Sequence, residues 1–134
     1  MLERTISREV TMGEELNYRH LSSSEREVLG RLLGASFPGC EALRGQLVSV
    51  QARYADENGG IWLRVDPLTK PADVIRRIPV EAEYDDGDGI RVHLLLHVLN
   101  GYMNELEVFR EDSGPVLESA DPNRLYIITH LPIG

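Results

Sequence analysis

The spacing of apolar residues is helical in the first third of the chain and alternating afterwards. Between residues 21 and 34 the apolar side chains recur three and four positions apart, which predicts one buried helix face: Val28, Leu29, Leu32 and Leu33. Ser22 and Glu25 precede this face at the spacing of a capping box, which is typical of a helix start. A second, shorter helix is predicted from Pro38 to Leu47.

From Val48 onward apolar and polar residues alternate, which predicts strands. The alternating runs lie at residues 48–54, 61–65, 78–84, 90–98, 105–109 and 125–129. Strands that follow one another without intervening helices favour an antiparallel sheet. We therefore predict an α+β fold in which an antiparallel sheet of about six strands carries two N-terminal helices on one face. Residues 1–20 are expected to form an N-terminal extension, and residues 21–134 a single domain.

The turns between these strands predict which side chains face one another. A five-residue turn over Asp85–Gly89 would place Glu83 opposite Arg91, and Glu81 opposite His93.

In the next hairpin a two-residue Asn100–Gly101 loop would oppose Leu96 to Glu105 and place a carboxylate in the core. A three-residue loop opposes His97 to Glu105 instead, and we prefer it.

Charge is concentrated in one part of the chain. The 134 residues carry 14 basic and 22 acidic side chains, a net charge of −8. The segment from Glu81 to Asp112 holds nine of the acids and only two bases, and so accounts for −7 of the total. A field of one sign attracts cationic partners and repels phosphate, so direct nucleic-acid binding is not expected.

The polar face of the predicted sheet is the candidate site. We expect it to bind a basic protein partner through these residues: Glu81, Glu83, Asp85, Asp86, Asp88, His93, His97, Glu105, Glu107, Phe109 and Trp62. Two other interpretations remain open. The face is a solvated surface whose opposite charges pair with one another, or it is a metal or acid–base site centred on His93, His97 and Glu105.

Other features of the sequence point to few further functions. Cys40 is the only cysteine, which fits a reducing cytoplasm, and neither a signal peptide nor a membrane span is evident. The Asp85–Gly89 run resembles a calcium loop but lacks the downstream glutamate. No cofactor and no catalytic residue is predicted.

Three stretches resemble a family of small bacterial proteins of unknown function: Ile78–Glu83, Val92–Val98 and Glu105–Asp112, together with the helical region Leu21–Leu47. The resemblance covers residues 21–112 and implies an α+β domain, but it transfers no activity. In general character the chain is also similar to immunity proteins, small acidic proteins that neutralise toxins in bacterial competition. The sequence therefore favours an acidic protein-binding module, an immunity protein that covers the basic surface of a toxin.

Overall fold

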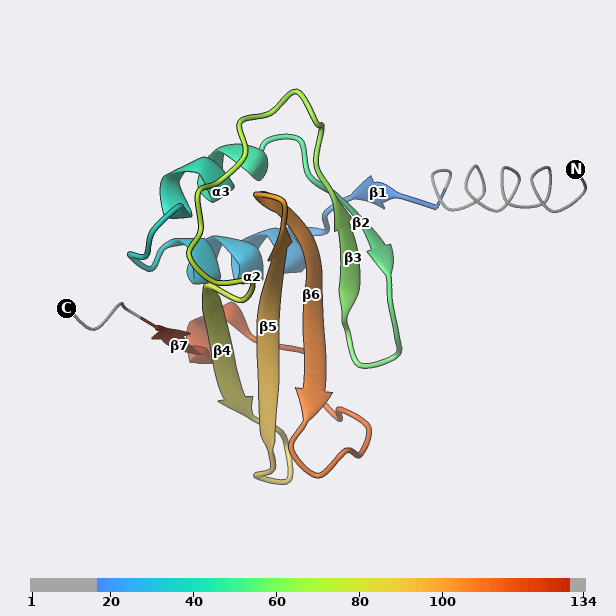
Figure 1. The fold of residues 1–134 in the computed structure, drawn as a ribbon. Helices are drawn as coiled ribbons and strands as arrows, with labels where there is room; N and C mark the ends of the chain where they lie inside the picture. The colour runs from blue at the N-terminus through green and yellow to red at the C-terminus, as the bar shows by residue number, and fades with distance from the viewer. Residues whose placement is uncertain (1–16, 131–134) are drawn as a thin grey trace, which may run out of the picture.

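The computed structural model describes residues 17–130, which form one sheet and two helices (Figure 1). The helices are α2 (Ser23–Leu33) and α3 (Cys40–Gln46), and a 3-10 turn, η1, spans Pro122–Arg124. The strands are β1 (Arg19–His20), β2 (Gln51–Tyr54), β3 (Ile61–Arg64), β4 (Val80–Asp85), β5 (Arg91–Leu99), β6 (Tyr102–Arg110) and β7 (Tyr126–Thr129).

The strands form one antiparallel sheet in the order β1-β2-β3-β6-β5-β4-β7. The α+β class with an antiparallel sheet and two helices is confirmed, but the sheet has seven strands rather than about six. The additional strand is β1, which lies within the expected N-terminal extension and pairs with β2. Residues 1–16 of that extension lie outside the described residues.

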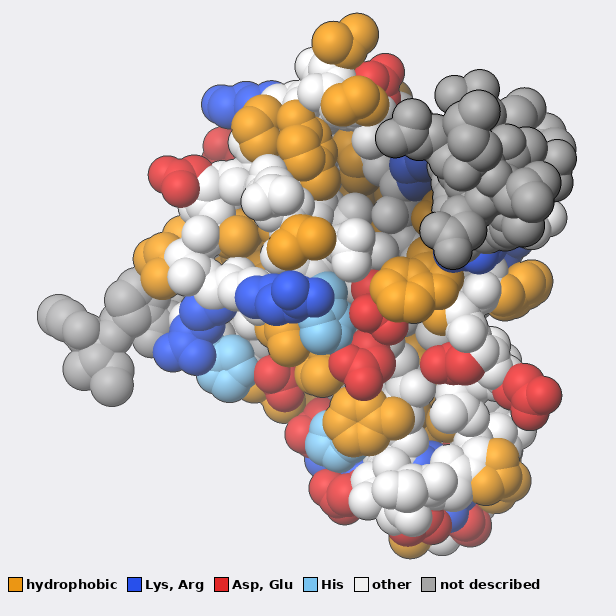
Figure 2. All heavy atoms as spheres, turned by 45° about the vertical axis from the view of Figure 1, so that its right-hand side comes forward, with side chains coloured by type: hydrophobic (Ala, Val, Ile, Leu, Met, Phe, Trp, Pro, Cys, Tyr) orange, Lys and Arg blue, Asp and Glu red, His pale blue; other side chains and the backbone are white. Residues whose placement is uncertain are grey.

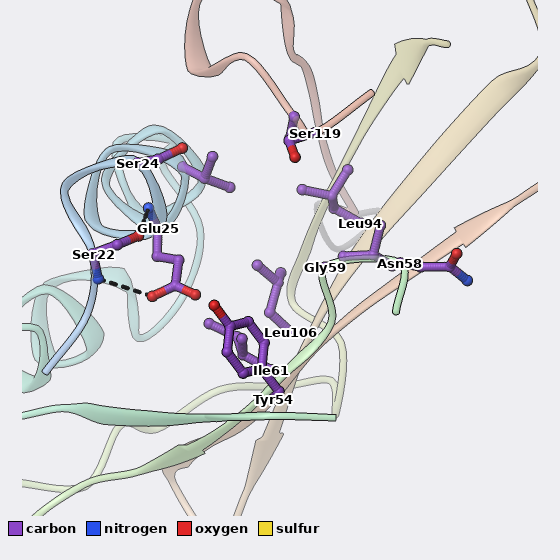
Figure 3. Close-up of a pocket in the computed structure, with 13 residues that line it drawn as sticks. Ser22, Ser24, Glu25, Tyr54, Asn58, Gly59, Ile61, Leu94, Leu106 and Ser119 are labelled. Carbon is purple, nitrogen blue, oxygen red and sulfur yellow. Dashed lines mark hydrogen bonds between the residues drawn. The ribbon is translucent and has the colours of Figure 1, made fainter. Parts of the chain in front are cut away.

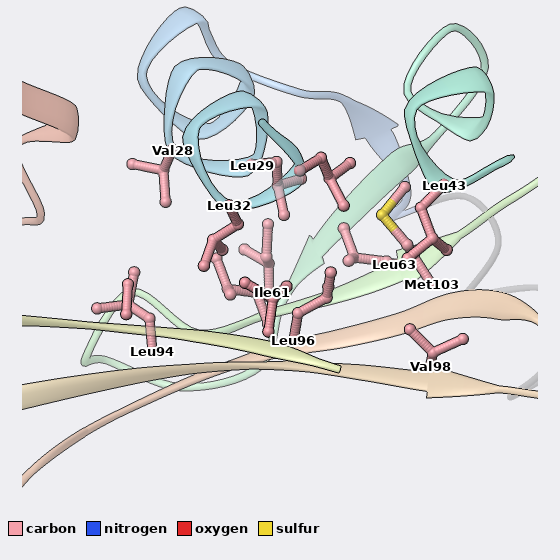
Figure 4. Close-up of a cluster of buried hydrophobic side chains, with 14 of the residues drawn as sticks. Val28, Leu29, Leu32, Leu43, Ile61, Leu63, Leu94, Leu96, Val98 and Met103 are labelled. Atoms are coloured by element: carbon pink, nitrogen blue, oxygen red, sulfur yellow. The ribbon is translucent and has the colours of Figure 1, made fainter. Parts of the chain in front are cut away.

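The core lies between the helices and one face of the sheet. A capping box starts α2, because Ser22 Oγ accepts from the N–H of Glu25 while the Glu25 carboxylate accepts from the N–H of Ser22. Its buried side chains are those that the periodicity predicted, Val28, Leu29, Leu32 and Leu33. In Figure 4 the α2 residues point toward Ile61, Leu94 and Leu96 of the sheet, and Leu43 of α3 packs beside Met103.

The hairpin between β4 and β5 differs from the prediction by one residue on each strand. Asp85 faces Arg91, so Glu83 faces His93 and Glu81 faces Leu95. The predicted cross-strand pairs Glu83–Arg91 and Glu81–His93 are therefore wrong. Each of these side chains nevertheless lies on the predicted face of the sheet. The turn begins at Asp86, whose N–H donates to the carbonyl of Ile90.

The hairpin between β5 and β6 has the predicted register with a different turn. His97 faces Glu105 and Leu96 faces Leu106, as expected from a three-residue loop. However, the turn itself is the two-residue Asn100–Gly101, and both residues have positive φ (54° and 86°). A bulge between His97 and Val98 absorbs the extra residue and keeps Glu105 out of the core.

Gln46 at the end of α3 holds this hairpin turn from the core side. Its side chain is fully buried, donates to the carbonyls of Gly101 (2.8 Å) and Lys70 (3.2 Å), and accepts from the N–H of Met103 (3.0 Å). A buried amide with three partners fixes the turn relative to the helix.

No helix among the described residues is both long enough and apolar enough to cross a membrane.

Candidate partner-binding face

The face of the sheet turned away from the helices is here called the outer face. Alternation along the strands places on it the side chains of Trp62, Glu81, Glu83, Arg91, His93, Leu95, His97, Glu105, Glu107, Phe109 and Ile128. Figure 2 views the molecule from a side on which acidic and histidine side chains are interleaved with hydrophobic ones. The structure thus brings most of the predicted site residues together on four adjacent strands of the sheet, β3, β6, β5 and β4.

One row of side chains crosses the centre of the outer face. Trp62 on β3 lies opposite Glu105 on β6, and Glu105 lies opposite His97 on β5. Trp62 is half-buried, and its indole N–H donates no hydrogen bond among residues 17–130.

His97 has hydrogen bonds that fix its tautomer. Its Nδ1 receives the Nε–H of Arg77 (3.3 Å), and its Nε2 lies 2.8 Å from Glu107 Oε1. An arginine can only donate, so Nδ1 is the acceptor and Nε2 carries the proton that is donated to Glu107. His97 therefore links Arg77 to Glu107 of β6 on the outer face.

His93 occupies the lower part of the face, in a row with Phe109. The two rings stack with centroids 5.0 Å apart and planes 17° from parallel. The Nε2 atom of His93 lies 3.2 Å from Glu111 and its Nδ1 atom 3.6 Å from Glu83. Phe109 thus packs over an imidazole and remains 36% exposed, which makes it an accessible aromatic group at the lower end of the outer face.

Glu105 has no hydrogen bond or ion pair within the part of the chain that the structure describes. Burial raises the pKa of its carboxyl. Of the two nearest charged neighbours, His97 lowers this pKa and Glu107 raises it. A half-buried carboxylate without a partner is a destabilising feature of a fold. A cation that approached it would restore the missing interaction.

Two of the three predicted aspartates, Asp86 and Asp88, lie in the β4–β5 turn and not on the outer face, which corrects the prediction, whereas Asp85 ends β4 beside Arg91 on that face. Asp86 is buried and pairs with Arg110 at 3.0 Å, and Asp88 and Asp112 pair with the same guanidinium at 2.9 and 2.6 Å. Arg110 faces the core side, because it lies two residues beyond the buried Val108. The Asp85–Gly89 run resembles a calcium loop in sequence, but in the structure the positive charge beside Asp86 and Asp88 is the guanidinium of Arg110.

Asp86 also fixes the segment that follows β6. Burial disfavours its charged form, but hydrogen bonds from the N–H groups of Leu117, Glu118 and Gly87 and from Arg110 outweigh burial and lower its pKa to about 2. The hydrogen bond from Arg110 likewise lowers the pKa of Asp112. These aspartates therefore connect two loops through Arg110, and Asp86 is fully buried there.

The nine acids of the Glu81–Asp112 segment thus fall into two groups. Five pair with arginines of the chain, since Glu83 and Asp85 contact Arg91 in addition to the three aspartates on Arg110. The other four have no arginine or lysine partner in the described part of the chain and share the outer face: Glu81, Glu105, Glu107 and Glu111. Glu111 was absent from the predicted site, although its spacing from Glu105 and Glu107 places it on the same face.

The metal and acid–base interpretation has little geometric support. Residues 17–130 contain no group of three or more His, Cys, Asp or Glu side chains arranged to hold a metal ion. His93 and His97 lie on the same strand, four residues and hence about 13 Å apart. Each contacts glutamates of its own, so they do not converge on one site.

Comparison with known families adds one finding. Residues 18–120 match the model of a family described as a domain of unknown function, DUF6984. The chain belongs to this family. The match spans both helices and strands β1 to β6 of the DUF6984 domain, and it extends slightly beyond the residues 21–112 that carried the resemblance. No curated protein and no solved structure matches the chain.

Proposed function

We propose that this DUF6984 domain is a protein-binding module whose outer face docks a partner that presents basic side chains. The observation that carries the proposal is Glu105, a partly buried carboxylate near the centre of that face that has no hydrogen bond or ion pair among residues 17–130. The other three glutamates that lack an arginine or lysine partner among residues 17–130 lie on the same face: Glu81, Glu107 and Glu111.

The charge of this face supports attraction of a cationic surface. Glu81 and Glu107 contact His130 and His97, and Glu111 contacts His93, so their nearest partners are histidines rather than arginines or lysines. Carboxylates gathered on one face attract cations over about a Debye length, roughly 8–10 Å at physiological salt. Electrostatic attraction of this kind speeds association and selects partners by charge.

Trp62 and Glu105 together form a seat for one basic side chain. They are cross-strand neighbours, so an arginine or lysine that stacks on the indole lies within reach of the carboxylate. A cation over a tryptophan ring gains about 0.5–2 kcal/mol, and the adjacent carboxylate adds an ion pair. Arginine fits best, because its planar guanidinium stacks and donates simultaneously.

The partner class suggested by the sequence, a toxin that an immunity protein neutralises, belongs to the same proposal. An inhibitor of this class covers a basic active site or nucleic-acid-binding surface, and this requires an acidic face with aromatic anchors. Phe109 and Trp62 supply the aromatic groups on the outer face.

Tryptophan fluorescence tests the site directly, because Trp62 is the only tryptophan of the chain. We expect a hexa-arginine peptide to change the emission of Trp62 saturably at low salt, and a hexa-glutamate peptide to have no effect. Glu105→Gln should weaken the response at least severalfold, whereas Glu41→Gln, on an exposed position of α3, should leave it unchanged. Equal responses of the two variants would remove Glu105 from the proposed site.

The partner class is tested by capture from cells followed by neutralisation. The wild-type chain and a Glu105→Lys, Glu107→Lys variant serve as paired baits, and a basic protein retained only by the wild type fits the proposal. If that protein is toxic, co-expression of the wild type should restore growth and the double variant should not. A partner that both baits retain at high salt contradicts binding through this face.

A further inference from the structure

The opposite side of the sheet is only partly covered by the helices. The 11 residues of α2 extend about 16 Å, whereas the nine residues of β5 and of β6 extend about 30 Å. The segment after β6 passes behind the sheet on its way to η1 and β7 (Figure 1) and covers part of the remainder. A cavity of about 230 Å³ lies between α2, the β2–β3 hairpin and this segment.

The cavity has an apolar floor and a polar opening. The floor consists of Val28, Ile61, Leu94, Leu106 and Val108, which come from α2 and three strands. Figure 3 shows Ser24 on the helix side, Ser119 on the segment that follows β6, and Tyr54 and Asn58 on the hairpin side. The hydroxyls of Ser24 and Ser119 and the amide nitrogen of Asn58 have no hydrogen-bond partner among residues 17–130, whereas Tyr54 interacts with Arg19, whose guanidinium lies 4.5 Å from the centroid of its ring.

The wall opposite α2 is held in place by hydrogen bonds from three parts of the fold. Asn58 Oδ1 accepts from the N–H of Val116, Asp86 accepts from the N–H groups of Leu117 and Glu118, and the Tyr84 hydroxyl donates to the carbonyl of Glu118 at 2.6 Å. Ser119 follows directly on this fixed stretch. The cavity is therefore formed before any ligand arrives, which reduces the ordering cost of binding.

The carboxylate at the opening, Glu25, already has its charge balanced by an arginine of the chain. Glu25 accepts two hydrogen bonds from Arg19, at 2.7 and 2.9 Å, and a third from the N–H of Ser22. The hydrogen bond from Arg19 is the largest influence on Glu25 and lowers its pKa, so the carboxylate stays ionised within a complete ion pair. The other polar groups at the opening are hydroxyls and an amide, which bind neutral donors and acceptors.

We infer that this cavity is a binding site for a small neutral amphipathic molecule, with an apolar body against Leu94, Leu106 and Val108 and a hydroxyl or carbonyl at the Ser24–Ser119 opening. An apolar cavity of about 150 Å³ is known to hold benzene in another protein, so this volume admits an aromatic ring with a short polar substituent. The site lies on the face opposite Trp62 and is independent of partner docking.

The site is tested by methyl NMR of the full chain titrated with 2-phenylethanol, and with phenylacetate and phenethylammonium as charged analogues. Saturable shifts are expected in the methyl groups of Val28, Ile61, Leu94, Leu106 and Val108. Leu43 and Val98 lie at the other end of the core in Figure 4 and should not shift. The neutral compound should bind at least severalfold more tightly than either ion.

Two serine variants distinguish this cavity from unspecific contact with the core. Ser119→Tyr places a ring at the opening and should abolish the shifts, whereas Ser49→Tyr, at an exposed position outside the cavity, should retain them. Thermal melts establish that both variants are folded. The inference is overturned if the cavity methyls do not shift, if Ser119→Tyr still responds, or if the ions bind as well as the alcohol.

Discussion

Replacement of Gln46 by methionine tests how the hairpin that carries His97 and Glu105 is anchored. Methionine keeps the unbranched shape of the side chain but removes its donor and acceptor. The N–H of Met103 then loses its acceptor inside the core, whereas the carbonyl of Gly101 keeps a hydrogen bond of 2.7 Å from the N–H of Ala72. An orphaned buried N–H costs about 1–3 kcal/mol, and the loss of the hydrogen bond to the Lys70 carbonyl, which, unlike that of Gly101, is not compensated by Ala72, costs about 0.5–1.5 kcal/mol.

The free energy of unfolding should therefore fall by about 2–4 kcal/mol in Gln46→Met. Urea unfolding followed by circular dichroism measures this loss, and the midpoint should decrease by roughly 1–2 M with an unchanged slope. A decrease below about 0.3 M would mean that the Met103 N–H finds water or another acceptor, and that the turn does not depend on α3.

A second substitution at the same position separates the donor from the acceptor. Gln46→Glu retains an acceptor for Met103 but turns an oxygen toward the carbonyls of Gly101 and Lys70, where only a protonated carboxyl can donate. Its folded-state pKa must then exceed the unfolded value of about 4.3. The variant should be closest to wild-type stability below about pH 4 and lose stability as the pH rises. A variant with no such pH dependence would contradict this account.

Three further predictions concern charge and the turn. The pKa of Asp86 is about 2, below its ordinary value of 3.8, so its contribution to stability is present above about pH 4 and lost as the pH falls toward 2. Asp86→Asn should flatten this acid dependence in urea unfolding and lower stability at pH 7. Because burial raises the pKa of Glu105, its charged form opposes folding, so Glu105→Gln should be more stable than wild type at pH 7 and show no gain below about pH 4. Asn100 has a φ of 54°, so Asn100→Ala should lower the free energy of unfolding by about 1–2 kcal/mol, whereas Asn100→Gly should leave thermal melts nearly unchanged.

The acidic segment shows why charge counted along a sequence differs from charge on a surface. The segment from Glu81 to Asp112 contains only two arginines, Arg91 and Arg110. Folding brings Arg110 against Asp86 and Asp88, from 24 and 22 residues away, and Arg91 against Glu83 and Asp85. The outer face therefore carries fewer acids without an arginine or lysine partner among residues 17–130 than the sequence suggested, and Glu105 is one of them.

The sequence by itself determined the local structure and the faces of the strands. The capping box of Ser22 and Glu25 and the leucine spacing of α2 depend on neighbours within a few residues, and alternation assigned Glu105 and His97 to the polar face. The Asn100–Gly101 pair was recognisable as a hairpin signal, because left-handed backbone at two successive positions favours these residue types, but a three-residue loop was expected there instead of the two-residue turn.

Only the tertiary structure decided which side chains meet. The bulge beside His97, the pairing of Arg110 with the turn aspartates, and the contact of Gln46 with Gly101 all join residues that are distant in sequence or depend on one extra residue in a strand. The cavity under α2 likewise results from the unequal rise of helix and strand, which no local pattern encodes. Periodicity fixes the direction of a side chain from its own backbone, but its partners are set by packing between segments that the pattern does not relate.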